Sequence, residues 1–178
     1  MKIFEYSLLI CIAICLIAIW LIAIYNKYQI YVIRINEAEA NIDSVLRKRF
    51  DLLNKSISII KSICTDEKDV LEMIVKLRSR KLTNFEFDRR LYESLNEFLK
   101  YGEKYPKLKQ NENYMKIGFG LNETESEIVA FRKYYNDIIT DYNKLVKTFP
   151  SNIVAKLCRY EYKTYFDGKA PNDDSIKV

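Results

Sequence analysis

The hydrophobic residues of this chain form one unbroken apolar stretch and, after it, several periodic stripes. The unbroken stretch, SLLICIAICLIAIWLIAIY, occupies residues 7–25 and contains no charge. As a helix that rises about 1.5 Å per residue it would cover roughly 28 Å, close to the hydrocarbon thickness of a bilayer. Interfacial aromatic residues are expected beside such a span, and they are present as Phe4, Tyr6, Tyr25 and Tyr28. The pattern predicts a membrane-spanning helix that contacts the lipid bilayer through residues 7–25.

A cleaved signal is the alternative to an anchor for this stretch. A signal peptide has an apolar core of about 7 to 15 residues followed by a small-residue cleavage site, and the stretch has neither feature. A lipoprotein signal needs a small residue before its cysteine, whereas Cys11 and Cys15 each follow Ile. The length of the stretch therefore favours an uncleaved anchor.

The basic residues around the stretch predict its orientation. Lys2 stands alone before it, whereas Lys27 and Arg34 follow closely after it. Because an excess of Lys and Arg marks the cytoplasmic flank, we expect a single-pass protein of the cell membrane with a short N-terminus outside and the rest in the cytoplasm. The opposite orientation would give a surface-exposed binding module.

Apolar residues then recur at steps of three and four, which predicts amphipathic helices. The first stripe consists of Tyr31, Ile35, Ala38, Ile42, Leu46, Phe50, Leu53, Ile57, Ile60 and Cys64. A second helix is expected after Thr65 and Asp66. Thr83 and Glu86 form a capping-box pattern ahead of a stripe from Phe87 to Leu99. Residues 66–104 are therefore expected to form either two helices or one kinked helix. In both cases the helical segment should end near Gly102 and the pair Tyr105 and Pro106.

Residues 105–122 are polar and contain Gly118 and Gly120, so we expect them to form a connection at least in part, with both glycines in a loop or at a helix end. A heptad seam follows the connection and predicts a packed helix. Its members are Ile128, Phe131, Tyr135, Ile138, Tyr142, Leu145 and Phe149. Phe149 and Pro150 should stop this helix, and Ser151 or Asn152 should cap a short one that carries Ile153, Val154, Leu157 and Cys158.

Two tyrosines in the seam are candidates either for packing or for chemistry. A buried tyrosine hydroxyl needs a polar partner, so Tyr135 and Tyr142 should each meet one. Asn136 and Asn143 lie on the flank of the seam, where their amides can bond to a neighbouring helix. A reactive tyrosine would need a lowered pKa, and Arg132 is the local cation that could lower it. Aromatic stripes at helical spacing favour packing.

Together these patterns predict an all-α fold with an N-terminal transmembrane helix followed by an antiparallel up-and-down bundle of about four helices. Residues 1–25 are the short N-terminus and anchor, residues 26–167 the bundle, and residues 168–178 a disordered tail. Three consecutive basic residues lie in the helix predicted from the first stripe: Arg47, Lys48 and Arg49. They either contact anionic lipid headgroups or form part of a solvated helix face.

The composition excludes several classes of function. The chain has no histidine, which removes the usual general base and the commonest nitrogen ligand of zinc. Its four cysteines form no CxxC pair. A net charge of +5 is dispersed among acidic residues, so no nucleic-acid binding is expected. We predict no catalytic, cofactor-binding or metal-binding residue; the alternative is an enzyme with a carboxylate metal site built from Glu123, Glu125 and Glu127.

Several motifs resemble the LemA family of bacterial membrane proteins. They are LRKRFDLL at 46–53, YPKLKQNENY at 105–114, TESEI at 124–128, FRKYYND at 131–137, DYN at 141–143 and FPSNIVAKL at 149–157. The resemblance implies an anchored antiparallel helical bundle with no established enzymatic activity and with no catalytic residues to transfer. Where the family commonly has Pro-Asn after its Asp-Leu signature, this chain has Leu53, Asn54 and Lys55, so the first helix should continue.

These features favour a non-catalytic interaction or scaffold module with an unknown protein partner. Anchoring would raise the local concentration of the bundle at the membrane and so make weak contacts effective. The motif residues proposed for structure or interaction are Tyr105, Pro106, Arg132, Tyr135, Asn136, Tyr142, Asn143, Phe149 and Pro150.

Overall fold

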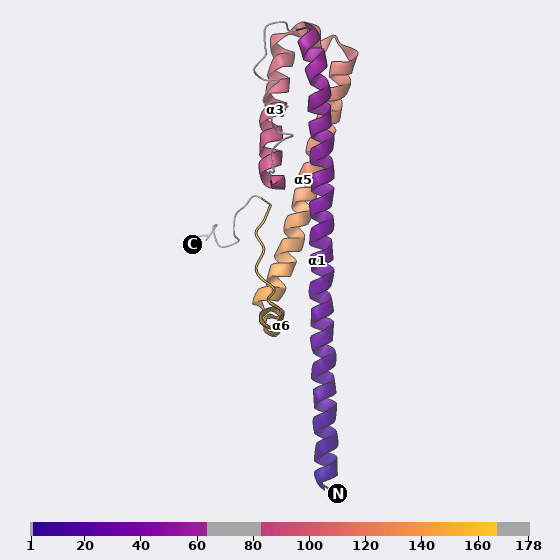
Figure 1. Cartoon of the computed structure of the whole chain (residues 1–178), viewed down its shortest axis with the longest axis vertical. Helices are drawn as coiled ribbons and strands as arrows, with labels where there is room; N and C mark the ends of the chain where they lie inside the picture. The colour runs from indigo at the N-terminus through magenta and orange to yellow at the C-terminus, as the bar shows by residue number, and fades with distance from the viewer. Residues whose placement is uncertain (1, 64–82, 167–178) are drawn as a thin grey trace, which may run out of the picture. The chain divides into compact units, whose positions relative to one another are not determined.

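The computed structural model describes residues 2–63 and 83–166. In this part of the chain all regular structure is helical and no strand is present, which confirms the all-α prediction. Figure 1 shows the helices α1 (Lys2–Ile63), α3 (Asn84–Lys104), α4 (Pro106–Lys109), α5 (Glu112–Lys147) and α6 (Ser151–Cys158). The helix predicted after Asp66 and the predicted tail at 168–178 lie outside the described residues.

The chain forms two compact units. Of the described residues, unit 1 comprises 2–37 and 136–165, and unit 2 comprises 38–63, 83–135 and 166. α1 and α5 each contribute one part to unit 1 and another to unit 2.

The part of α1 in unit 1 contains the apolar stretch. This helix is long and apolar enough to cross a membrane, and 0% of its most apolar window is buried within the protein. Exposed side chains there include Leu9, Ile14 and Ile17. Because such side chains need an apolar environment, the stretch is a candidate membrane anchor.

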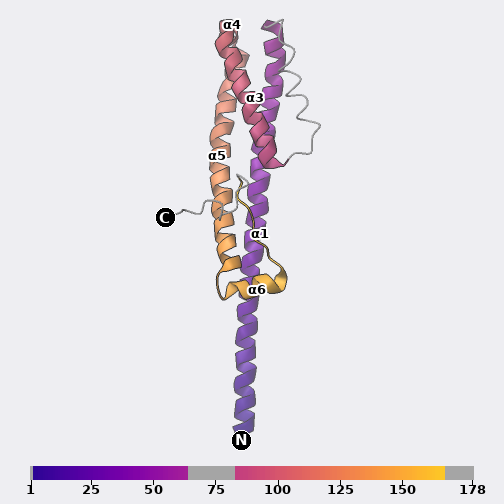
Figure 2. The ribbon, with the colours of Figure 1, turned by 90° about the vertical axis from the view of Figure 1, so that its left-hand side faces the viewer.

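Unit 2 is built from the later part of α1, from α3 and from the first part of α5. Glu39 pairs with Tyr135 near one end of these helices, whereas Leu52 lies beside Gly120 farther along, so α5 runs antiparallel to α1. α3 also runs antiparallel to α5, as Figure 2 shows. Most described members of the stripe predicted along α1 are buried: Ile35, Ala38, Ile42, Leu46, Leu53, Ile57 and Ile60. Tyr31 and Phe50 are half-buried, and Cys64 lies outside the described residues.

The predicted boundaries of α3 are confirmed. The backbone N–H of Glu86 donates to Thr83 Oγ1 at 3.3 Å, and the backbone N–H of Thr83 donates to Glu86 Oε2 at 3.1 Å. These reciprocal bonds satisfy two of the donors that a helix start leaves unpaired. At the other end, α3 stops one residue before Tyr105, and Pro106 begins α4 at a position where its missing N–H costs nothing.

The prediction of a loop or helix end at Gly118 and Gly120 is wrong. α5 begins at Glu112, so both glycines lie inside a helix. A Cβ atom on Gly120 would lie 3.1 Å from Leu52 Cδ1, which is tighter than ordinary contact. Close helix packing therefore outweighs the local preference of glycine for turns, because the small residue lets another helix approach.

Unit 1 contains the end of α5, the short helix α6 and the segment 159–165. α5 ends at Lys147, just before Phe149 and Pro150, as predicted. The predicted cap of α6 is wrong, because Pro150 occupies the N-cap position and makes no side-chain cap bond. Ser151 Oγ donates instead to the carbonyl oxygens of Leu145 at 2.7 Å and Thr148 at 2.9 Å, so it ties α6 to the end of α5.

Candidate functional site

Four charged side chains meet inside unit 2, and we call them the arginine cluster: Arg49, Asp88, Glu125 and Arg132. They come from all three long helices of the unit. The guanidinium of Arg49 lies 3.5 Å from Asp88 Oδ1 and 2.5 Å from Glu125 Oε2. Asp88 also pairs with Arg132. Two positive and two negative groups therefore balance each other across α1, α3 and α5.

The cluster is largely removed from water. The side chain of Arg49 is 0% exposed and that of Asp88 is 4% exposed. Arg49 Nε donates to Thr124 Oγ1 at 3.3 Å, and Thr124 is itself fully buried. Burial lowers the pKa of the Arg49 guanidinium, and Glu125 opposes that change. Arginine still keeps its proton at physiological pH, so the cluster is a set of paired charges rather than a proton relay.

The basic residues at positions 47–49 have three different environments. Arg47 is exposed and pairs with Asp43 one helical turn away, at 2.7 Å. Lys48 lies 3.2 Å from both Glu123 and Glu127 on α5. Arg49 is buried, so it neither contacts headgroups nor solvates a helix face, and both sequence interpretations fail for it. A side chain at this position faces the other helices rather than the surface.

Tyr135 has the properties of a packed residue. It is 9% exposed, and its hydroxyl donates to Glu39 Oε1 at 3.3 Å. Burial and the neighbouring carboxylate of Glu39 raise the pKa of Tyr135 to about 12. Arg132, the cation considered for lowering that pKa, pairs with Asp88 and lies over the ring of Phe166, 5.3 Å from its centroid. At neutral pH this phenol stays protonated and acts as a hydrogen-bond donor.

Unit 1 has a second cluster, the tyrosine cluster of Tyr28, Tyr142 and Tyr160. The ring of Tyr28 stacks on Tyr160 with centroids 4.4 Å apart and meets the edge of Tyr142 at 6.0 Å. The Tyr142 hydroxyl donates to the Glu161 carbonyl at 3.0 Å. Burial raises the pKa of Tyr28 and of Tyr142. Both phenols are therefore neutral and fix the segment that follows α6.

Asn143 bonds to backbone rather than to a neighbouring helix. Its Nδ2 donates to the Lys163 carbonyl at 2.8 Å, and its Oδ1 accepts from the Lys163 N–H at 3.0 Å. One side chain thus satisfies both backbone groups of a residue that belongs to no helix or strand.

The other motif residues are spread through the chain. Tyr105 stacks beside Tyr101, and Pro106 starts α4. Asn136 is half-buried on α5, and its carbonyl accepts from Thr140. Phe149, expected at the end of the seam, is 79% exposed. The proposed motif therefore does not converge on a single site.

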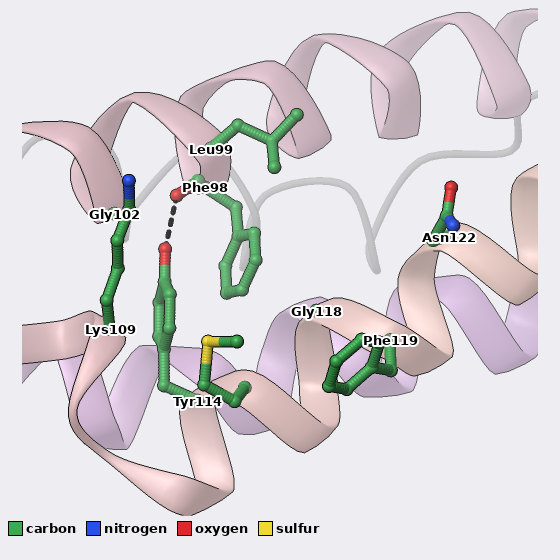
Figure 3. A pocket seen from close by; sticks show the side chains of 9 residues that line it. Phe98, Leu99, Gly102, Lys109, Tyr114, Gly118, Phe119 and Asn122 are labelled. Carbon is green, nitrogen blue, oxygen red and sulfur yellow. Dashed lines mark hydrogen bonds between the residues drawn. The ribbon is translucent and has the colours of Figure 1, made fainter.

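An apolar groove lies on unit 2 between α3 and α5, with a volume of about 340 Å³. Figure 3 shows Phe98, Gly102 and Tyr114 lining it, with the Tyr114 hydroxyl bonded to the Phe98 carbonyl at 2.6 Å. Its rim includes Leu99, which is 53% exposed, and Phe119, which is 68% exposed. Apolar and aromatic side chains of this kind are typical of binding surfaces.

Sequence reasoning missed Asp88, Thr124 and the inward position of Arg49. Each stands where helical spacing calls for a core residue. Asp88 precedes Leu91 and Leu95 at steps of three and four, and Thr124 lies four residues before Ile128. The signal that could have revealed them is a charged or hydroxyl residue at a helix position that otherwise carries buried apolar residues. Two opposite charges at such positions indicate a buried ion pair.

The acidic residues considered for metal binding are engaged with cations. Glu123 and Glu127 pair with Lys48, and Glu125 pairs with Arg49. Within residues 2–63 and 83–166, no group of three or more acidic or thiol ligands is placed to hold a metal ion. These charge pairs join α1 to α5.

Across residues 2–63 and 83–166 the fold is all-α, with a candidate membrane anchor in α1. The chain belongs to the LemA family, whose model matches residues 38–178. Protein LemA of Metamycoplasma hominis is 29% identical over 147 residues, in an alignment that covers 72% of this chain and 67% of that protein. The resemblance seen in the motifs is thereby confirmed. The family model begins after the apolar stretch, so the candidate anchor rests on residues 7–25 of this chain alone.

Proposed function

We propose that this chain is a single-pass membrane protein whose helical bundle acts in the cytoplasm as a non-catalytic interaction module. The observation that carries the proposal is the uncharged stretch of residues 7–25, which is helical and has its side chains outside the protein core. The hydrocarbon core of a bilayer can cover such a surface along its whole length.

The engaged charges of unit 2 support a binding role over catalysis. Catalytic acids and bases usually lie in clefts with a pKa tuned toward neutrality. Here the two carboxylates of the arginine cluster each contact a guanidinium, and the pKa of Tyr135 is shifted away from neutrality. The cluster specifies how three helices pack, which suits a module that presents a surface.

The surface that we propose for a protein partner is the groove between α3 and α5. Phe119 and Leu99 offer apolar area at its rim, and Lys109 and Asn122 add polar atoms among its lining residues. This chemistry fits an apolar helix or strand with a polar edge. Anchoring raises the concentration of the bundle near the membrane, so that weak contacts with a membrane-associated partner become effective.

The topology is tested with a single cysteine in an otherwise cysteine-free chain. Lys133 is exposed on α5, so Lys133→Cys should react with an impermeant maleimide only after cells are permeabilised. Labelling of intact cells would instead support the surface-exposed binding module. Loss of the chain from membranes during an alkaline carbonate wash would contradict the anchor itself.

The groove is tested with a photo-crosslinking residue at Met115 in native membranes. We expect a defined adduct that Phe119→Glu abolishes and that Lys133→Glu, away from the groove, leaves unchanged. An adduct that is insensitive to Phe119→Glu would contradict the groove as the partner site. Stoichiometric iron, manganese or calcium in the purified chain would favour the carboxylate enzyme instead.

A further inference from the structure

The short helix α6 has an apolar face on each side. Val154 and Ala155 are buried, each with 2% of its surface exposed. On the opposite side, Ile153 is 50% exposed and Leu157 is 75% exposed, and they lie one helical turn apart. Phe149, just before the helix, is 79% exposed. We call Phe149, Ile153 and Leu157 the outer face of α6.

The contacts of Tyr28 place α6 close to the end of the apolar stretch. The Tyr28 hydroxyl donates to the Leu145 carbonyl at 2.6 Å and to the Ser151 carbonyl, in the first turn of α6, at 3.2 Å. Tyr28 follows Tyr25, the last residue of the stretch, by three positions, which is about 4.5 Å along a helix. Gln29 Nε2 adds a bond to the Tyr160 hydroxyl at 2.8 Å. The start of α6 and the segment after it are therefore fixed within about one turn of the end of the span.

α6 also has the direction of an interfacial helix. Figures 1 and 2 show α6 running across α1 rather than along it. If α1 crosses the bilayer, a helix across it lies parallel to the membrane plane. The polar interfacial layer is about 5 to 8 Å thick on each side of the hydrocarbon, so a helix held this close to the end of the span lies within it.

The charge around α6 matches an anionic lipid surface. Between Lys144 and Lys163 the chain has five basic residues, Lys144, Lys147, Lys156, Arg159 and Lys163, and one acidic residue, Glu161. Lys156 and Arg159 are exposed on α6 and at its end. Lys144 pairs with Asp141 at 3.1 Å, and Lys147 lies over the ring of Tyr162. Exposed cations beside an apolar face are typical of helices that bind membrane surfaces.

We propose that α6 lies in the headgroup layer of the bilayer that α1 crosses, with its outer face in contact with acyl chains. The inference rests on the proposed anchor. It adds a second point of lipid contact, supplied by the later chain segment of unit 1, residues 136–165. A lone amphipathic segment of this size would bind weakly. Its attachment to Tyr28 removes most of the cost of association, because the anchor already holds it at the surface.

The position of α6 is tested by spin labelling of the full chain in vesicles of phosphatidylcholine with 30% phosphatidylglycerol. The four cysteines are replaced, and single cysteines are introduced as Ile153→Cys, Leu157→Cys and Asp141→Cys, with Cys15 retained alone in a fourth variant. Each nitroxide is then compared for collision with oxygen, which concentrates in lipid, and with a water-soluble nickel chelate. Asp141 is exposed on α5 in the same unit and is the matched aqueous control.

The four labels separate the inference from the anchor on which it rests. We expect the label at Cys15 to be the deepest in the bilayer. The ratio of oxygen collisions to nickel collisions should be several-fold higher for the labels at 153 and 157 than for the label at 141. The label at 141 should collide mainly with the nickel chelate. Aqueous behaviour at 153 and 157 with a deep Cys15 label overturns the inference and leaves the anchor intact. Aqueous behaviour at Cys15 overturns both.

A surface that binds a second protein copy gives a different result. Spin–spin broadening at 153 or 157 that disappears on dilution with unlabelled chain would overturn lipid contact in favour of self-association. In pure phosphatidylcholine we expect the lipid signature at 157 to weaken, because Lys156 and Arg159 lose their anionic partners. An identical signature in both lipids would contradict the role assigned to these charges.

Discussion

Arg49 and Asp88 face each other across two helices with their charged groups 3.5 Å apart, and neither side chain is more than 4% exposed. Removing water from two charges costs free energy that the pairing must offset. Asp88 receives a second cation from Arg132, and Arg49 a second anion from Glu125. The pair is therefore part of a neutral set of charges that joins α1, α3 and α5.

Asp88→Ala should destabilise the bundle strongly. The substitution leaves Arg49 buried with one anion and takes from Arg132 its carboxylate partner, and breaking a buried pair typically costs about 3 to 5 kcal/mol. The free energy of unfolding is measured with urea on the full chain in mild detergent. Arg47→Ala is the matched control, because its exposed pair with Asp43 should contribute about 0.5 kcal/mol or less. Equal losses in the two variants would contradict a special role for the buried cluster.

Alkaline pH should weaken unit 2 through Tyr135. The pKa of this phenol is about 12 in the folded chain and near 10 when unfolded, so its stabilising contribution is complete below pH 10. Between pH 10 and 12 only the unfolded chain loses the proton, and stability falls by about 2 to 3 kcal/mol in total. Tyr135→Phe cannot titrate, so its unfolding free energy should decline less over this window. Parallel pH curves for the two proteins would refute the shifted pKa.

Two glycines should respond in opposite ways to alanine. Within a helix, Gly to Ala favours folding by up to about 1 kcal/mol where space exists. A Cβ atom on Gly118 would lie 3.8 Å from Phe98, in ordinary contact, so Gly118→Ala should raise the melting temperature. A Cβ atom on Gly102 would lie 2.8 Å from the Tyr114 hydroxyl, so Gly102→Ala must displace a group that bonds to Phe98.

Thermal unfolding of both alanine variants checks this contrast. We expect Gly102→Ala to melt below the parent protein and Gly118→Ala above it. Stabilisation by both substitutions would mean that Tyr114 moves aside at little cost.

Asn143→Leu should loosen the segment after α6. It removes two bonds to the backbone of Lys163 and leaves polar groups to find water, at a local cost of about 1 to 3 kcal/mol. Hydrogen exchange at the Lys163 amide should therefore be about tenfold to a hundredfold faster. Lys144→Ala, at an exposed neighbouring position, is the control and should leave that exchange rate unchanged. Unchanged exchange in Asn143→Leu would show that the segment is held by other contacts.

Features encoded locally were predictable from the sequence. The capping box of Thr83 and Glu86 needs only a spacing of three residues, and the helix stop at Phe149 and Pro150 needs only the geometry of proline. The seam positions Tyr135 and Tyr142 followed from helical periodicity and are buried.

Features that depend on distant residues were not predictable in this way. The inward position of Arg49 is stable only because Asp88 and Glu125 come from other helices. The helical state of Gly118 and Gly120 depends on how closely α1 and α3 approach α5. The cap of α6 failed because the Ser151 hydroxyl bonds back to α5 instead. In each case a tertiary contact outweighed a local preference.

The bonds of Tyr28 also have a consequence for the order of events during translation. Its two carbonyl partners lie 117 and 123 residues later in the chain. At about 5 to 20 residues per second, the ribosome supplies them roughly 6 to 25 s after Tyr28 has been made. Throughout that interval the Tyr28 hydroxyl lacks both of these carbonyl partners, and unit 1 can form completely only when synthesis has passed Tyr160.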